Sequence, residues 1–145
     1  MSVVFEVVAP RLLGPAVVIA LALIVKGYQD TGDGFSAGVI VALAIALRYV
    51  VLGVDEAERG LPVLRHAPAT AACGLLVALA VGFGPVAAGD PPFTHFPRPG
   101  AHVVHLGTLE LLTAVAFDIG VFLLVTGALT MVVHHLARLV EASRA

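Results

Sequence analysis

The stretch GFSAGVIVALAIALRYVVLG, residues 34–53, decides the fold class. Arg48 is its only charged side chain. A helix rises about 1.5 Å per residue, so the stretch can cross the roughly 30 Å hydrocarbon core of a bilayer. Small residues recur at every fourth position and share one stripe of such a helix: Gly34, Gly38, Ala42 and Ala46. Such a stripe lets a second helix approach closely, and that helix can belong to a neighbouring subunit or to this chain.

The composition of the whole chain agrees with a membrane protein. Of its 145 residues, 59% are hydrophobic and 12% are charged, and the mean hydropathy is +1.03. Soluble domains are usually about 45–50% apolar and about 25% charged. A chain this small cannot hide so much apolar surface from water, so the excess must face lipid or other subunits. The net charge of −2 argues against a nucleic-acid partner, and the single Cys73 excludes an internal disulfide.

Apolar runs predict an all-α integral membrane protein, a bundle of four transmembrane helices in one domain covering residues 1–145. The runs are too long and too rich in Ala and Leu for barrel strands. The first lacks a basic leader and a small-residue cleavage site, so we interpret it as a retained span. The predicted spans are roughly 8–26, 35–52, 67–87 and 106–136.

The distribution of basic residues predicts the orientation of the spans. Most of them fall on one side: Arg11, Arg48, Arg59, Arg65, Arg138 and Arg144. The other side has Lys26 and Arg98. The positive-inside rule then places both termini and the 53–66 connection in the cytoplasm. On the same interpretation Tyr49 is an interfacial anchor, and Arg48 reaches to the lipid headgroups.

Acidic residues supply the candidates for ion chemistry. Asp118 lies inside the fourth apolar run, where a carboxylate costs about 2.5–3.5 kcal/mol and should face protein or water. It can belong to an ion pathway or anchor a neighbouring helix by a hydrogen bond. Glu110, about two turns earlier, is a second pathway candidate. Asp33 precedes Gly34 as a helix cap would, and with Asp30 it alternatively forms a cation-attracting mouth.

Histidines suggest a pH-responsive group more than a metal site. His105 stands at the expected start of the fourth span, where imidazole could respond to pH near neutrality. Although His102 precedes it by three residues, no cysteine or carboxylate motif accompanies the pair, and we expect no metal. The sequence shows no nucleophile triad, phosphate loop or cofactor fingerprint. We therefore expect neither a cofactor nor an enzyme.

Two stretches resemble the B subunit of Mrp-type multisubunit cation/proton antiporters, the MnhB family. GYQDTGDGFSAGVIVALAIALRYVVLG, residues 27–53, resembles its G-H-x-x-P-G-G-G-F-x-x-G signature, and HLGTLELLTAVAFDIGVFLLVTGAL, residues 105–129, resembles its fourth-helix signature. The matched positions are Gly27, Gly32, Gly34, Phe35, Gly38, Arg48, Tyr49, Gly107, Thr108, Phe117, Asp118, Gly120, Val121 and Leu123. Tyr28, Thr31 and Asp33 depart from the first signature, where the family has histidine, proline and glycine. Because tyrosine cannot titrate as histidine does, these departures argue against a proton relay in that turn.

The resemblance implies a small subunit of a cell-membrane antiporter that exchanges Na⁺ for H⁺. It implies the A, C, D and smaller subunits of that complex as partners, with assembly and possible participation in the ion pathway as the role. Two alternatives remain open: a purely structural assembly subunit, and an MnhB-like subunit of a membrane-bound hydrogenase-type complex.

Overall fold

The computed structural model describes residues 3–26, 33–96, 105–106, 109–110 and 113–143. Within these residues, four helices are long and apolar enough to cross a membrane, which confirms the all-α expectation. The elements are α1 (Val3–Lys26), α2 (Asp33–Leu52), α3 (Val54–Gly60), the 3₁₀ helix η1 (Pro62–His66), α4 (Ala67–Ala87), β1 (His105–Leu106), β2 (Leu109–Glu110) and α5 (Thr113–Ala142).

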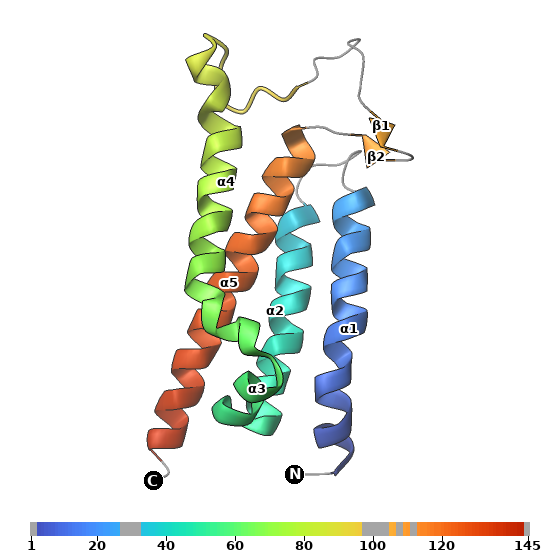
Figure 1. The fold of residues 1–145 in the computed structure, drawn as a ribbon, viewed down its shortest axis with the longest axis vertical. Helices are drawn as coiled ribbons and strands as arrows, with labels where there is room; N and C mark the ends of the chain where they lie inside the picture. The colour runs from blue at the N-terminus through green and yellow to red at the C-terminus, as the bar shows by residue number, and fades with distance from the viewer. Residues whose placement is uncertain (1–2, 27–32, 97–104, 107–108, 111–112, 144–145) are drawn as a thin grey trace.

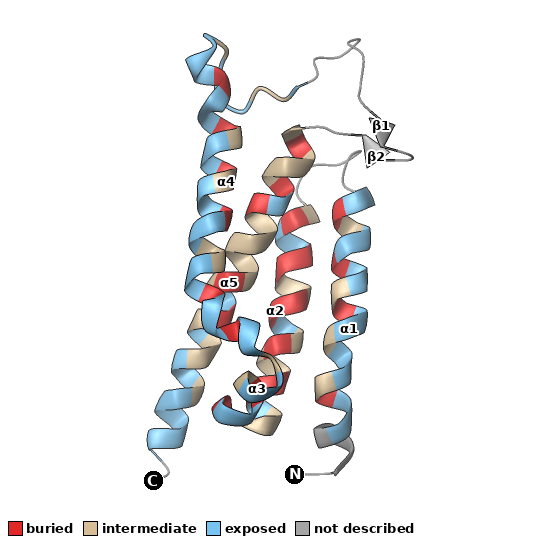
Figure 2. Ribbon diagram, viewed as in Figure 1, coloured by how far each residue is buried: buried red, intermediate tan, exposed pale blue. Residues whose placement is uncertain are grey.

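The four long helices lie side by side in a row whose order differs from the order along the chain (Figure 1). α1 packs on α2, α2 packs on α5, and α5 packs on α4. α2 is the most buried span, whereas α1 and α4 stand at the two edges and expose apolar side chains along much of their length (Figure 2). The start of α1, the end of α5 and the α3–η1 connection lie together at one end, which we call the α3 end.

Glycines set the distance between α2 and α5. A Cβ atom on Gly34 would collide with the main chain of Asp118, and one on Gly38 would lie 2.8 Å from the Cβ of Val125. The missing side chains therefore let the two helices touch backbone to backbone. At the first two positions of the small-residue stripe predicted on the second span, the helix that packs closely is therefore α5 of the same chain.

A second seam of small residues joins α4 to α5, on a span for which no such stripe was predicted. A Cβ atom on Gly120 of α5 would lie 2.8 Å from the main-chain nitrogen of Ala78 on α4. One on Gly127 would lie 2.5 Å from the nitrogen of Ala71, and Gly74 lies against the main chain at Leu124. α4 is held to the row along this seam.

α5 differs from the span expected at 106–136 at both ends. The residues before Thr113 include an antiparallel pair of short strands, with His105 opposite Glu110. The backbone nitrogen of Thr113, the first residue of α5, donates to the carbonyl of Phe96 at 3.0 Å. Its hydroxyl oxygen in turn accepts the N–H of Phe96 at 2.8 Å. At its C-terminal end α5 continues to Ala142, through polar residues that a hydropathy plot does not assign to a span.

The 53–66 connection folds into α3 and η1 across the α3 end. Gly53 has a φ of 77°, a conformation that L side chains rarely adopt, and it makes the reversal between α2 and α3 possible. The N–H of Val54 donates to Oε1 of Glu141 at 3.0 Å, which ties the start of α3 to the last turns of α5. This connection brings the charges of α3 against the polar end of α5.

Candidate functional site

Asp118 is buried where α2 and α5 meet, with 2% of its surface exposed. It lies in the second turn of α5, and Gly34, in the first turn of α2, rests against its main chain. A carboxyl group at this depth is stable only among polar partners or water. The structure therefore agrees with the expectation that Asp118 faces protein rather than lipid.

Among the other sequence-predicted residues, those that the structure describes lie in α2, β1 and β2. Asp33 is the first residue of α2, half-buried beside Gly34, where its charge complements the helix dipole. His105 and Glu110 face each other as backbone partners in β1 and β2, rather than lying on a helix. Phe35 is exposed. Ala42 is buried and Ala46 is half-buried, and Gly27, Asp30 and Gly32 lie outside the described residues.

An aromatic cluster packs at the α4–α5 contact near Asp118. Phe93, in the segment after α4, has a φ of 60°, which is unusual for a bulky residue. Its N–H donates to the carbonyl of Gly82 at 2.7 Å. Its ring lies 5.6 Å from that of Phe83 and 6.0 Å, edge to face, from that of Phe117. The residue after Phe117 is Asp118, so this cluster covers α5 beside the buried acid.

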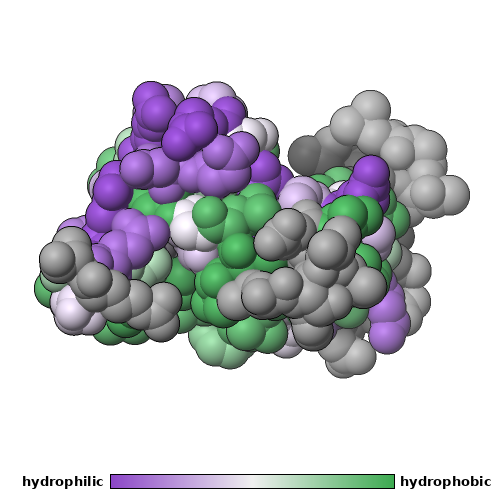
Figure 3. Space-filling model, turned by 90° about the horizontal axis from the view of Figure 1, so that it is seen from below, coloured by the Kyte–Doolittle hydropathy of each residue, from purple (hydrophilic) through white to green (hydrophobic). Residues whose placement is uncertain are grey.

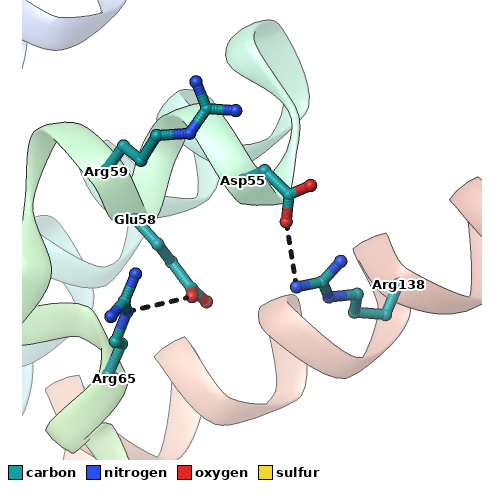
Figure 4. A pocket seen from close by; sticks show the side chains of 5 residues that line it. All are labelled: Asp55, Glu58, Arg59, Arg65 and Arg138. Carbon is teal, nitrogen blue, oxygen red and sulfur yellow. Dashed lines mark ion pairs between the residues drawn. The ribbon is translucent and has the colours of Figure 1, made fainter.

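A second polar site, not predicted from the sequence, lies at the α3 end. The carboxylate of Glu58, only 12% exposed, lies 2.8 Å from Nδ1 of His134 and 3.7 Å from Nε of Arg65. Asp55 pairs with Arg138 at 3.0 Å. Figure 4 shows the two acids reaching from α3 toward these arginines. We call Asp55, Glu58, Arg65, His134 and Arg138 the α3-end cluster.

A cavity of about 370 Å³ opens beside this cluster, lined by Asp55, Glu58, Arg59, Arg65 and Arg138. Seen from the lower end, hydrophilic side chains gather on one side of the molecule, and apolar side chains are exposed beside them (Figure 3). This end therefore offers water a charged hollow next to the apolar spans.

The predictions for Arg48 and Tyr49 are wrong. Arg48 is only 8% exposed and its guanidinium group lies against Gly60 at the end of α3, so it does not reach to the headgroups. Tyr49 is also buried, and its hydroxyl donates to Oε1 of Glu58 at 3.4 Å. The α3–η1 connection packs over the end of α2. Hydropathy does not predict which segment packs there, so it does not predict the burial of these two residues.

Polar side chains recur every fourth residue along α5, with an apolar interruption at Phe122. We call the set the α5 stripe: Asp118, Thr126, Thr130, His134 and Arg138. Thr126 donates its hydroxyl to the carbonyl of Gly38 at 3.4 Å, which places this part of the stripe against α2. The spacing is visible in the sequence, but only the structure shows that α3 and α2 meet it. Among the described residues, no group of three His, Cys, Asp or Glu side chains is placed to hold a metal ion.

Comparisons with known proteins agree with these features. A family model described as "Domain related to MnhB subunit of Na+/H+ antiporter" matches residues 4–131. The chain is 34% identical over 111 residues to the Na(+)/H(+) antiporter B subunit of Alkalihalophilus pseudofirmus, covering 76% of this chain and 75% of that protein. It is 35% identical over 109 residues to the protein of the same name from Bacillus subtilis, covering 72% and 71%. It is also 34% identical over 128 residues to the probable K(+)/H(+) antiporter A/B subunit of Rhizobium meliloti, covering 88% of this chain and 12% of that protein.

Proposed function

The chain belongs to the MnhB family, and from that premise we propose that it is a membrane subunit of a multisubunit monovalent cation/proton antiporter. The relatives that share its length carry antiporter names, which favours this function over a hydrogenase-type complex or a self-contained enzyme. One relative is named for potassium and two for sodium, so we propose a monovalent cation as the class of cargo. Other subunits of the complex, with A, C, D and smaller ones expected, are its partners.

The chain is a multi-pass membrane protein, and we propose that its α3 end faces the cytoplasm. Five of its arginines belong to the α3 end or to the adjoining parts of the spans: Arg11, Arg48, Arg59, Arg65 and Arg138. Lys26 stands at the opposite end of α1. The positive-inside rule supports this orientation, with both termini in the cytoplasm.

The burial of Asp118 is the observation that carries the mechanism. A carboxyl group held at the contact between α2 and α5 can take and release a proton or a cation, provided that water or a partner chain reaches it. We infer that Asp118 lines or shapes the ion pathway. Asp33, next to Gly34 at the start of α2, complements the positive end of that helix by its negative charge.

The Asp118→Asn variant tests this role in the whole complex. Asparagine keeps the volume of the side chain and removes its charge, so assembly should persist while cation/proton exchange in everted vesicles is lost. Blue-native electrophoresis measures assembly in the same membranes. Asp33→Asn is the matched control, because it removes a half-buried charge nearby and should leave most of the exchange intact. Normal exchange by assembled Asp118→Asn complexes would refute a direct role.

A structural assembly role is the second candidate, and the exposed apolar edge of the row favours it. α4 exposes Leu75, Leu76, Leu79 and Phe83, which lipid or another protein of the complex must cover. Cys73 is exposed on the same helix. In the intact complex, a short thiol-to-amine cross-linker at Cys73 should capture a partner protein if this edge is an interface. Capture together with normal exchange by Asp118→Asn would favour assembly as the main role.

A further inference from the structure

Thr130 has a buried hydroxyl group that lacks a partner. The residue is 2% exposed, and its Oγ1 has no hydrogen-bond partner among the residues that the structure describes. An unsatisfied buried hydroxyl is costly, and native proteins usually satisfy such groups with protein atoms or ordered water. This hydroxyl lies on the α5 stripe, one turn from His134.

Thr130 lines a cavity large enough for water. Between α1, α2, η1, α4 and α5 there is a cavity of about 290 Å³ with mostly apolar walls and three threonines, Thr70, Thr126 and Thr130. Thr70 donates to the carbonyl of His66 at 3.1 Å, and Thr126 donates to that of Gly38. A water molecule occupies about 30 Å³ of liquid, so the space admits several. The Thr130 hydroxyl is the unpartnered polar group beside this space, and rotation of the side chain about χ1 would turn it toward such a water.

A titratable pair lies one turn farther along the stripe. His134 contacts Glu58, which Tyr49 of α2 and Arg65 of η1 also face, with Arg138 and Asp55 beside them. A third cavity, of about 240 Å³, is lined by both Glu58 and His134 and shares Leu64 and Ala67 with the threonine cavity. It also shares Glu58 and Arg65 with the charged hollow at the α3 end. The three cavities therefore follow one another from the charged surface into the span.

We propose that Glu58 and His134 are a proton-uptake pair, and that Thr130 holds the water to which they pass the proton. This inference rests on the proposed antiporter function. Glu58 accepts the proton from water in the charged hollow and gives it to His134. The imidazolium, protonated by Glu58 at Nδ1, releases its Nε2 proton to water at Thr130. Both side chains return to their starting charges, and rotation of the imidazole ring restores the starting tautomer. The stripe is interrupted at Phe122, so the route we assign ends at Thr126.

A proton suits this route better than a dehydrated metal cation. The threonine cavity offers few oxygen ligands among apolar walls, whereas a chain of hydroxyl-bound water conducts protons without stripping a hydration shell. The Glu58 carboxylate lies 2.8 Å from Nδ1 of His134, so a proton can pass directly between the two side chains.

The hydration of the cavity can be measured without transport. In the complex carrying Cys73→Ala, the Thr130→Cys thiol should react with a small charged methanethiosulfonate reagent, read as a mass shift of this chain. Val54→Cys is the control: Val54 is fully buried nearer the aqueous end but does not line the cavity. We expect reaction at Thr130→Cys to be at least about tenfold faster, since only water-exposed thiolates react. Equal rates would overturn the proposal.

Transport by matched variants tests the proton step. Thr130→Val removes the orphan hydroxyl with little change of shape and should slow exchange about tenfold, whereas Thr130→Ser restores it. Thr70→Val, in the same cavity, removes a hydroxyl already bonded to its own helix and should leave the rate unchanged. Glu58→Gln keeps hydrogen bonding to His134 but accepts no proton, so exchange should lose its dependence on pH at the α3 end. A Thr130→Val rate within about threefold of that of Thr70→Val would refute the route.

The two proposals fail separately. If Asp118→Asn is inactive and Thr130→Val is normal, the route is wrong and the role of Asp118 stands. If Thr130→Val is slow and Asp118→Asn is normal, the route stands and the role of Asp118 falls. Blue-native electrophoresis confirms assembly of each variant before its rate is compared.

Discussion

Gly74→Ala is expected to loosen the α4–α5 seam, although alanine is the better helix former. A Cβ atom on Gly74 would lie 2.5 Å from the carbonyl oxygen of Gly120, 0.9 Å short of the 3.4 Å at which ordinary contact begins. It would also lie 2.9 Å from the carbonyl carbon of Leu123. These are main-chain atoms of α5, which cannot rotate aside as a flexible side chain would. The added methyl group must therefore push the two helices apart.

The size of the effect follows from two opposing terms. Overpacking lowers the free energy of unfolding by about 1–3 kcal/mol. Because the new methyl group at Gly74 would meet main-chain atoms, we expect its cost at the upper end of that range. Replacing glycine by alanine in a helix returns about 1 kcal/mol. The net loss is about 2 kcal/mol, which raises the unfolding equilibrium constant roughly 30-fold.

Unfolding in mixed micelles by added sodium dodecyl sulfate, followed by far-ultraviolet circular dichroism, measures this loss. Gly84→Ala is the matched control on the same helix, because a Cβ atom there meets nothing within 4 Å. That variant should change stability by less than about 1 kcal/mol, as the helical gain is partly offset by Pro85 after it. Equal stabilities of Gly74→Ala and Gly84→Ala would refute the assignment of a tight seam.

The remaining predictions concern the loop after α4 and the α3 end. Phe93→Gly should be less destabilising than Phe93→Ala by about 1 kcal/mol in the same titration, because glycine relieves the positive φ; the reverse order would contradict the strain. Arg138→Ala should cost less than about 1 kcal/mol, since its pair with Asp55 is exposed, and the loss should shrink at high salt. Glu141→Ala should cost about 1–3 kcal/mol because it removes the acceptor for the N–H of Val54, and a smaller loss than that of Arg138→Ala would count against this ranking.

Apolar content and the spacing of small residues determined part of the packing in advance. The stripe that begins Gly34, Gly38 predicted a close helix contact, and the structure shows that α5 of the same chain makes it. The same spacing occurs at Gly74, Ala78 and Gly82 on α4, and Gly74 and Ala78 form part of the α4–α5 seam. The pattern identifies a contact surface but not the helix that fills it.

The sequence by itself determined that this is a helical membrane protein with an acid that must turn inward at Asp118. Both conclusions depend on the free energy of transferring a residue or an apolar run from water to lipid. That free energy follows from the composition of the run and the position of the residue in it. The order of the helices in the row, the burial of Arg48 and the contact between Glu58 and His134 were decided only by the tertiary structure. The spans are apolar on nearly all sides, so periodicity does not say which face meets which helix. The connection through α3 brings Glu58 to His134, and no local property of either segment predicts that contact.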